Sequence, residues 1–235
     1  MWPVEHVGVV DSTMNLARQR ALAGAQEGTT VVAQGQTAGR GRRGRVWHSE
    51  PGAGLWMTTI LRPGRRDDVQ TLGLVAGAAV WQALGVEGLG LKWPNDVEYK
   101  GRKLCGILLE GEGDVVLVGI GINVCANVPP DLAPHVASLD ALVGGSAALL
   151  HTTLASVMGS LESCYHKWQT QGFVAILPVW QRADVLFGET VRAEVDGRWL
   201  QGEALGLAAN GALRLKTASG EVLVYAGEVE RVRAC

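Results

Sequence analysis

Several features that mark large protein classes are missing from this sequence. No stretch reaches the roughly 18 consecutive apolar residues that a membrane-spanning helix requires. The segment from Met1 to His6 lacks the basic start and apolar core of a signal peptide. The four cysteines form no Cys-x-x-Cys pair, and the five histidines show no metal-ligand spacing. We therefore expect no membrane span and no zinc site, and we expect a reduced, cytoplasmic protein.

An excess of charge of one sign is missing as well. The 21 Lys and Arg residues nearly balance 23 Asp and Glu residues, and the net charge is −2. The chain as a whole is therefore not a basic nucleic-acid binder, although a local basic patch stays open. Hydrophobic residues make up 47% of the 235 residues and charged ones 19%, which is typical of a globular protein. Glycine is in excess, with 32 residues.

Apolar periodicity and turn residues predict alternating strands and helices over the first three quarters of the chain. We expect strands at 7–10, 29–34, 55–61, 89–93, 104–110 and 115–124. We expect helices from Asp11-Ser12-Thr13 to Gly24, from Asp67 to Gly85, over 146–168, and over 173–184 with Pro178 bending or interrupting the last. Pro129, Pro130 and Pro134 predict a loop.

The character of the sequence changes from Gly188 onward. Three turn signals join short strand-like segments there, namely Asp196-Gly197, Asn210-Gly211 and Ser219-Gly220. Four or five short strands in about 50 residues are typical of a small β-barrel. We therefore predict a separate domain that starts near Val185.

The first chemical motif is the run from Gln36 to Trp47, which holds four arginines within seven positions. Alternating glycines let backbone amides approach a ligand closely, and guanidinium groups supply forked donors for phosphate or carboxylate. A solvated loop and an arginine–glycine RNA-binding tract are the alternatives. The motif is short and lies between two apolar strands, which favours an anion site.

The second motif is Lys92-Trp93-Pro94-Asn95-Asp96, followed by Lys103 at the entrance to the next strand. Asn95 and Asp96 lie at a strand end, where they can orient a metal or an amine. The alternative is an ordinary β-hairpin with polar turn residues. The third motif is Gly119 to Asn123, where glycines inside an apolar strand indicate either a nearby ligand or close packing.

Together and in this order, the motifs resemble those of the biotin–protein ligases, which attach biotin to carboxylase carrier domains. The matching residues are Asp11-Ser12-Thr13, Gln36 to Arg45 with Trp47, Lys92 to Asp96, Arg102-Lys103-Leu104 with Gly106-Ile107, and Gly119 to Asn123. The resemblance implies an α+β fold, with a mixed sheet flanked by helices as in class II synthetases and biotin ligases. It also implies a catalytic domain over 1–184 and a small SH3-like barrel over 185–235.

The resemblance further implies an ATP-dependent reaction that forms biotinyl-5′-AMP, with Mg²⁺ present, and then biotinylates a lysine of a carrier protein. The implied catalytic residues are Lys103, Arg42 and Asp96. The implied biotin-binding residues are Ser12, Thr13, Gln36, Arg40, Gly41, Arg42, Lys103 and Gly106. The implied nucleotide-binding residues are Arg40, Arg42, Trp47, Lys92, Asn95, Gly121 and Asn123. Three partners stay open for Asp96: the metal, the nucleotide and the acceptor lysine.

Two departures from the family pattern affect these expectations. Met14 separates Ser12-Thr13 from Asn15, so we do not expect Asn15 to contact biotin. The match begins almost at Met1, so we expect a monofunctional ligase that binds neither DNA nor membrane. Its partner would be the biotin carboxyl carrier domain of acetyl-CoA carboxylase or a related carboxylase, and a homodimer is compatible with the family. A lipoate or octanoate ligase and a nucleic-acid-binding module using Arg40 to Arg45 are the rival functions.

Overall fold

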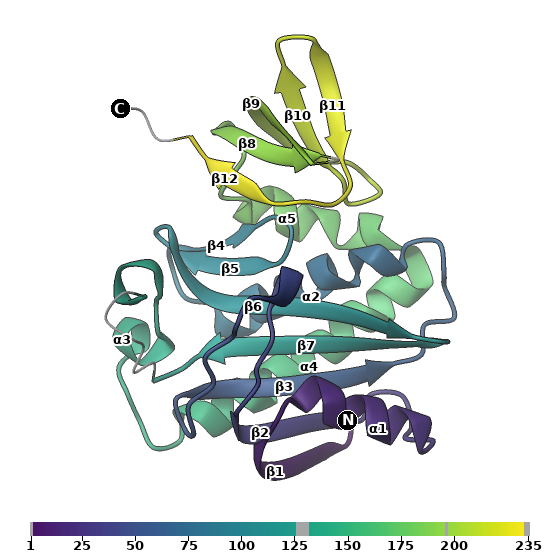
Figure 1. Cartoon of the computed structure of the whole chain (residues 1–235), viewed down its shortest axis with the longest axis vertical. Coiled ribbons are helices and arrows are strands. Elements are labelled where there is room, and N and C mark those ends of the chain that lie inside the picture. Colours follow the sequence, from purple (N-terminus) through teal and green to yellow (C-terminus); the bar gives the residue numbers. More distant parts are fainter. Residues whose placement is uncertain (1, 126–131, 196, 233–235) are drawn as a thin grey trace.

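The computed structural model describes residues 2–125, 132–195 and 197–232. A seven-stranded mixed sheet forms the larger part of the molecule (Figure 1), in the strand order β1-β2-β3-β7-β6-β5-β4. Its strands are β1 (Val4–Val10), β2 (Thr30–Gln36), β3 (Gly54–Leu61), β4 (Leu89–Lys92), β5 (Asp96–Tyr99), β6 (Arg102–Glu112) and β7 (Val115–Asn123). β1 and β2 run parallel, and the other neighbours run antiparallel.

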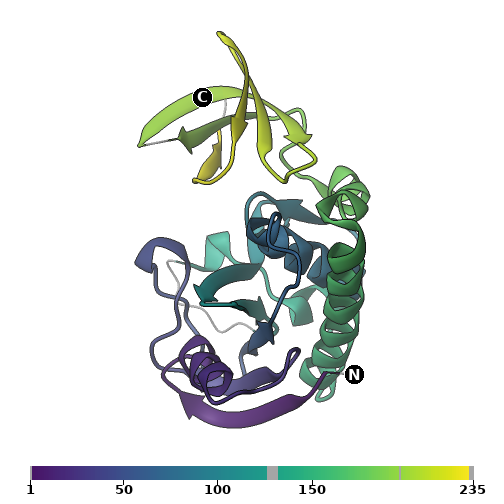
Figure 2. The same ribbon diagram turned by 90° about the vertical axis from the view of Figure 1, so that its right-hand side faces the viewer.

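Helices cover both faces of this sheet (Figure 2). α1 (Thr13–Leu22) lies on one face, whereas α2 (Leu72–Leu84) and α4 (Leu149–Gln171) lie on the other. The shorter helical segments are η1 (Arg42–Gly44), η2 (Val69–Thr71), η3 (Ala133–His135), α3 (Leu139–Val143), η4 (Phe173–Ala175) and α5 (Leu177–Ala183). None of the helices in the described ranges is long and apolar enough to cross a membrane. The α+β architecture expected from the sequence is confirmed.

The helix boundaries follow from local chemistry. Ser12 caps α1, because its Oγ accepts a hydrogen bond from the Met14 amide at 3.2 Å. Gly85 ends α2 in the left-handed conformation, with φ of +58°. The expected start of that helix at Asp67 is wrong, since α2 begins at Leu72 after the separate turn η2. Pro178 lies in the first turn of α5, where its missing amide costs no helical hydrogen bond.

The second motif folds as a β-hairpin. β5 and β6 are joined by a turn in which Lys100 has φ of +48° and Gly101 has φ of +80°. Two consecutive positive φ values match the twist of antiparallel strands, so this is a tight hairpin turn. Before it, a cis peptide bond joins Trp93 to Pro94. The β-hairpin that the sequence offered as an alternative is therefore present. The hairpin places Asp96 and Lys103 on neighbouring strands.

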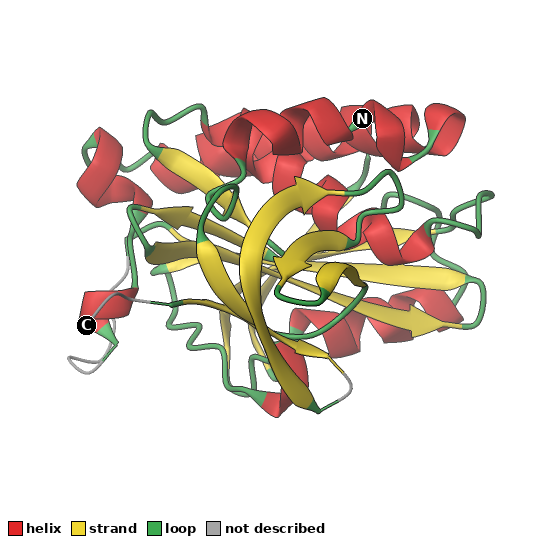
Figure 3. Ribbon diagram, turned by 90° about the horizontal axis from the view of Figure 1, so that it is seen from above, coloured by secondary structure: helices red, strands yellow, loops and turns green. Residues whose placement is uncertain are grey.

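The C-terminal residues form a second, antiparallel sheet in the order β11-β10-β9-β8-β12, which lies above the large sheet (Figures 1 and 3). Its strands are β8 (Thr190–Val195), β9 (Arg198–Leu207), β10 (Leu213–Thr217), β11 (Gly220–Val224) and β12 (Val229–Arg231). The sequence predicted a small barrel here, and within the described residues its five strands form an open sheet, with β12 paired to β8 at one edge and β11 at the other. Asp196, Pro129 and Pro130 fall outside the described residues.

Candidate active site

A pocket of about 460 Å³ lies on the α1 side of the large sheet. Its walls come from α1, from the segment between β2 and β3, from β3 to β7, and from Glu228 to Glu230 at the start of β12. All fourteen site residues expected from the sequence line it, namely Ser12, Thr13, Gln36, Arg40, Gly41, Arg42, Trp47, Lys92, Asn95, Asp96, Lys103, Gly106, Gly121 and Asn123. The fold thus brings together residues from widely separated segments.

One end of the pocket is polar and uncharged. The Gln36 side-chain oxygen accepts from the Thr13 amide at 2.8 Å and lies 3.1 Å from the Thr13 hydroxyl. Thr58 on β3 donates to that hydroxyl at 2.8 Å, and the Gln36 amide nitrogen donates to Ser49 at 2.8 Å. Ser12 and Thr13 are 2% and 4% exposed. A buried chain of neutral donors and acceptors fixes these side chains and suits an uncharged polar ligand group.

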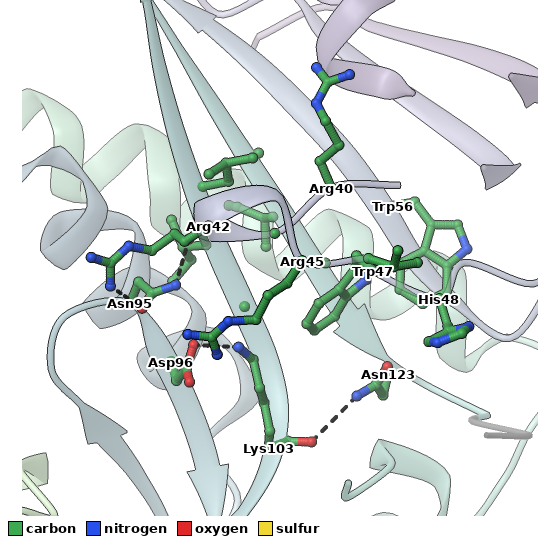
Figure 4. A pocket seen from close by; sticks show the side chains of 18 of the residues that line it. Arg40, Arg42, Arg45, Trp47, His48, Trp56, Asn95, Asp96, Lys103 and Asn123 are labelled. Carbon is green, nitrogen blue, oxygen red and sulfur yellow. Dashed lines mark hydrogen bonds and ion pairs between the residues drawn. The ribbon is translucent and has the colours of Figure 1, made fainter. Parts of the chain in front are cut away.

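The segment that carries the arginine tract forms a hairpin between β2 and β3, with Arg40 and Val46 opposite each other. The Trp47 amide donates to the Gly39 carbonyl at 2.9 Å, and the Gly41 amide donates to the Arg45 carbonyl at 2.8 Å. Gly39 is required there, because a Cβ atom would lie 2.4 Å from the Trp47 carbonyl oxygen. We refer to residues 39–47 as the arginine hairpin. It passes in front of the large sheet and forms the outer wall of the pocket (Figure 4).

Trp47 lies across the floor of the pocket. A Cβ atom at Gly121 would be 2.6 Å from the Trp47 Nε1 atom, and one at Gly106 would be 2.9 Å from the indole ring. The two strand glycines therefore make room for this ring, and for Gly121 this is the close packing that the third motif offered as one of its two explanations. The Trp47 Nε1 atom is buried and has no hydrogen-bond partner among the described residues. Asn123, at the end of β7, donates to the Lys103 carbonyl at 3.4 Å.

Cations gather at the end of the pocket opposite the neutral one. Lys103 Nζ lies 2.6 Å from Asp96 Oδ1 and 5.2 Å from the centre of the Trp47 ring (Figure 4). Arg42 donates to the Asn95 side-chain oxygen at 3.1 Å and to the Gly227 carbonyl at 2.9 Å. Burial lowers the pKa of Arg42 below the usual arginine value, and the nearby Asp96 carboxylate partly opposes this effect. Both hydrogen-bond partners of Arg42 are neutral, so a bound anion would compensate its charge.

Arg40 lines the pocket, and its side chain is held by residues of α1 and β6. Its guanidinium points away from the pocket centre toward α1 (Figure 4). There it donates to the Asn15 side-chain oxygen at 2.8 Å and lies 3.6 Å from Glu110. Asn15 in turn donates to Asp11 at 2.6 Å. Asn15 therefore anchors the arginine hairpin to α1 through Arg40.

Sequence reasoning missed several residues that line the pocket. Arg45 belongs to the arginine tract but received no role, and it pairs with Glu228 from the C-terminal sheet. Thr58 completes the neutral end of the pocket. Arg45 could have been found from its place in the tract. Glu228 had no local signal, because its position depends on how the second sheet sits on the first.

Asp96 offers a magnesium ion a carboxylate in this pocket, whereas the lining residues Glu228 and Glu230 are paired with arginines. Asp96 Oδ1 is buried and accepts no well-directed hydrogen bond from the described residues, although it is ion-paired with Lys103. The described ranges contain no group of three or more His, Cys, Asp or Glu side chains placed to hold a metal. Mg²⁺ usually binds one or two protein carboxylates and takes its other ligands from substrate phosphates and water. Asp96 fits that pattern when a polyphosphate is bound.

Comparison with known proteins identifies the family of this chain. Residues 7–127 match the biotin/lipoate A/B protein ligase family, and residues 186–232 match the biotin protein ligase C terminal domain. The chain belongs to the biotin/lipoate A/B protein ligase family. The pocket of this family member draws on both matched regions, since Glu228 to Glu230 lie in the second one.

Relatives of this ligase-family chain are named as biotin ligases. The biotin–[acetyl-CoA-carboxylase] ligase of Paracoccus denitrificans is 33% identical over 93% of this chain and 96% of that protein. The bifunctional ligase/repressor BirA of Bacillus spizizenii is 36% identical over 94% of this chain and 72% of that protein. The biotin protein ligase of Aquifex aeolicus in complex with biotin and ATP has a TM-score of 0.88, with 28% identity over all of both chains.

Proposed function

We propose that this ligase-family chain activates biotin with ATP and transfers the biotinyl group to a lysine of a biotin carboxyl carrier domain. The biotin carboxylate attacks the α-phosphate of ATP, biotinyl-5′-AMP forms, and pyrophosphate leaves. The amine of the acceptor lysine then attacks the acyl carbon, an amide forms, and AMP leaves. The relatives named as biotin ligases and the similarity to a biotin- and ATP-bound structure support this reaction.

The observation that carries the proposal is the change in polarity along the pocket. The neutral end lies at α1 and β3, the Trp47 ring covers β6 and β7, and the Lys103–Asp96 pair joins β6 to β5. Because β3, β7, β6 and β5 are successive neighbours, the two ends are about 14 Å apart at ~4.8 Å per strand spacing. Biotin has an uncharged ureido head, an apolar chain and a terminal carboxylate. These three parts match the neutral end, the Trp47 ring and the cationic end of the pocket, in that order.

The cationic end is suited to the first chemical step. Two anions, the carboxylate and the triphosphate, must approach each other, so charge neutralisation and positioning dominate the barrier. Lys103 is mounted on a strand and would contact the carboxylate and α-phosphate oxygens. Arg42, which is partly desolvated and has neutral partners, would contact the phosphate side.

The residues around this end would also protect the acyl-adenylate. The arginine hairpin and Trp47 would separate the mixed anhydride from bulk water and from stray amines. Asp96 orients Lys103 and is the carboxylate that would hold Mg²⁺, which neutralises charge on the polyphosphate when it is bound. Lys92 and Asn95 would border the nucleotide, together with Gly121 and Asn123.

A biotin-dependent exchange of labelled pyrophosphate into ATP tests the first step. We expect exchange with biotin, and mass gain on a biotin carboxyl carrier domain when that domain is added. A carrier domain whose acceptor lysine is replaced by arginine serves as the matched control and should gain no mass. Exchange with lipoate or octanoate and none with biotin would contradict the substrate assignment.

The internal partners of the arginine tract disfavour the nucleic-acid alternative. Arg40 pairs with Glu110, Arg43 with Glu194 and Arg45 with Glu228. A basic surface that binds RNA needs guanidinium groups that are free to contact phosphates. Retention of the protein on RNA, lost steeply as salt rises, would nevertheless revive that function.

A further inference from the structure

Arg43 is the one arginine of the tract that does not line the described pocket. Its guanidinium forms an ion pair with Glu194 of β8 and lies 3.9 Å from a Glu228 carboxylate oxygen. Its backbone has φ of +56° and ψ of +33°, a left-handed conformation that arginine rarely adopts. A non-glycine residue persists in this conformation when its surroundings hold it there. The surroundings of Arg43 are the bond from the Arg45 amide to the Arg42 carbonyl, at 3.2 Å, and its side-chain contacts to the C-terminal sheet.

The C-terminal sheet has its own attachments to the large sheet, away from the arginine hairpin. Arg231 of β12 donates to Glu98 of β5, whose side chain is buried. The Trp93 indole donates to the Gly211 carbonyl at 3.1 Å, and the Val185 amide donates to the Leu91 carbonyl at 3.0 Å. These contacts place the second sheet without help from Arg43.

Glu194 and Glu228 share one rigid anchor within that sheet. The Glu194 amide donates to the Glu228 carbonyl at 2.9 Å. Gly227, which precedes Glu228, packs so closely that a Cβ atom there would lie 2.1 Å from the Glu194 carbonyl oxygen. The two carboxylates therefore present a fixed acceptor pair to the arginine hairpin.

Arg43 lies between Arg42 and Arg45 in the same short turn, so its backbone is continuous with theirs. Arg42 turns inward to Asn95 and also reaches the Gly227 carbonyl. Arg45 pairs with Glu228. Because η1 is a single short turn, a shift of its central residue would displace the Arg42 side chain from the pocket.

We propose that Arg43 is a positioning residue, and that its ion pairs with Glu194 and Glu228 hold the arginine hairpin closed over the pocket. This inference rests on the proposed function, because the closed hairpin serves to retain biotinyl-adenylate until the carrier lysine arrives. The C-terminal sheet then controls retention of the intermediate through the carboxylates of Glu194 and Glu228, the second of which lies at the rim of the pocket. We refer to Arg43, Glu194 and Glu228 as the clasp, because they join the arginine hairpin to the C-terminal sheet.

The partial exposure of this clasp sets the size of its effect. The side chains of Arg43, Glu194 and Glu228 are 48%, 19% and 23% exposed. Ion pairs of this kind are worth at most about a fivefold change in an equilibrium, and salt screens them. We expect preformed biotinyl-adenylate to leave Glu194→Gln and Arg43→Ala about fivefold faster than it leaves the wild type.

Two kinetic controls separate a clasp from a general loss of structure. The double variant Arg43→Ala/Glu194→Gln should release the intermediate no faster than Arg43→Ala. The reason is that the two substitutions break the same ion pair. Glu221→Gln, which breaks the exposed Arg214–Glu221 pair on the same sheet, should behave as wild type. At about 1 M salt, the wild-type release rate should approach that of Glu194→Gln. Additive effects, or an equal effect of Glu221→Gln, would overturn the clasp.

Limited proteolysis with trypsin tests the clasp without any reaction. Glu194→Gln keeps all four arginines of the tract, so cleavage within residues 40–45 can be compared directly with the wild type and with Glu221→Gln. We expect faster cleavage there in Glu194→Gln alone, and equal rates in all three proteins would reject the inference. If the wild type forms no biotinyl-adenylate, the proposed function fails, while the cleavage rates still decide whether the clasp exists.

Discussion

Replacing Lys103 by methionine removes the charge at the centre of the cationic end with little change in side-chain length. The methionine stem can keep the contact with the Trp47 ring, over which the ammonium now lies at 5.2 Å. The ion pair with Asp96, at 2.6 Å, is lost. Asp96 would then add an uncompensated negative charge beside two anionic substrates. We therefore expect slower formation of biotinyl-adenylate for two electrostatic reasons.

The structure limits the size of this effect. A unit charge about 4 Å from a developing charge is worth roughly 4 kcal/mol at an effective dielectric of about 20. Removal of one donor aimed at developing charge typically costs about 10²- to 10³-fold in kcat. Because the Lys103 side chain is 35% exposed, solvent screens part of this interaction. We therefore expect an effect at the lower limit of this range, a decrease of about 100-fold in the single-turnover rate.

The assay is single-turnover pyrophosphate release at saturating biotin and ATP, with thermal unfolding as the test of folding. Loss of this partly exposed ion pair should lower Tm by about 4 °C. Lys100→Met is the matched control, because Lys100 lies in the turn of the same hairpin, over the Tyr99 ring, and does not line the pocket. An unchanged rate in Lys103→Met, or an equal loss in the control, would refute the assignment. A raised KM for ATP with unchanged kcat would limit Lys103 to ground-state binding.

Three further predictions follow from single contacts. Gly121→Ala should displace the Trp47 ring, since the new Cβ would lie 2.6 Å from Nε1, and should weaken ATP binding measured by calorimetry. Gly111→Ala on β6, where no atom lies within 4 Å, should leave binding unchanged. Arg42→Gly should speed release of biotinyl-adenylate, seen as labelling of bystander proteins, and an intermediate that stays bound would contradict this. Burial raises the pKa of Asp184 above its ordinary 3.8, so the folded state holds its proton more tightly than the unfolded chain. That carboxylate therefore costs stability as pH rises above 4, and Asp184→Asn should raise Tm at pH 7 with a gain that shrinks toward pH 4.

Local signals in the sequence were sufficient for much of the fold. Ser12 was expected at a helix start because its side chain accepts hydrogen bonds from free amides, and it caps α1. Gly85 was expected at a helix end because it tolerates positive φ, and it ends α2. The turn residues predicted the short strands of the second sheet, but not that the sheet stays open in the described residues, since closure depends on pairing between distant edge strands.

The set of residues around the pocket was predictable from motifs, but the direction of each side chain was not. Motif order placed Gln36 and Lys103 in one site, and both line the pocket. The outward turn of Arg40 depends on Asn15 and Glu110, which reach it only through tertiary folding. The contribution of Glu228 depends on the docking of the second sheet onto the first. Side-chain direction follows from partners that are distant in sequence, and a motif does not encode them.

The electrostatic character of the pocket follows from how carboxylates are distributed among the arginines. A run of four arginines suggests a strongly cationic loop, yet Arg40, Arg43 and Arg45 each have a glutamate within ion-pair distance. Arg42 instead bonds two neutral oxygens and is partly desolvated. An incoming phosphate would therefore gain most from Arg42, because the other three guanidiniums would first have to give up a carboxylate. The same neutralisation stabilises the packing of the hairpin against the second sheet, while Arg42 is directed to Asn95 in the pocket.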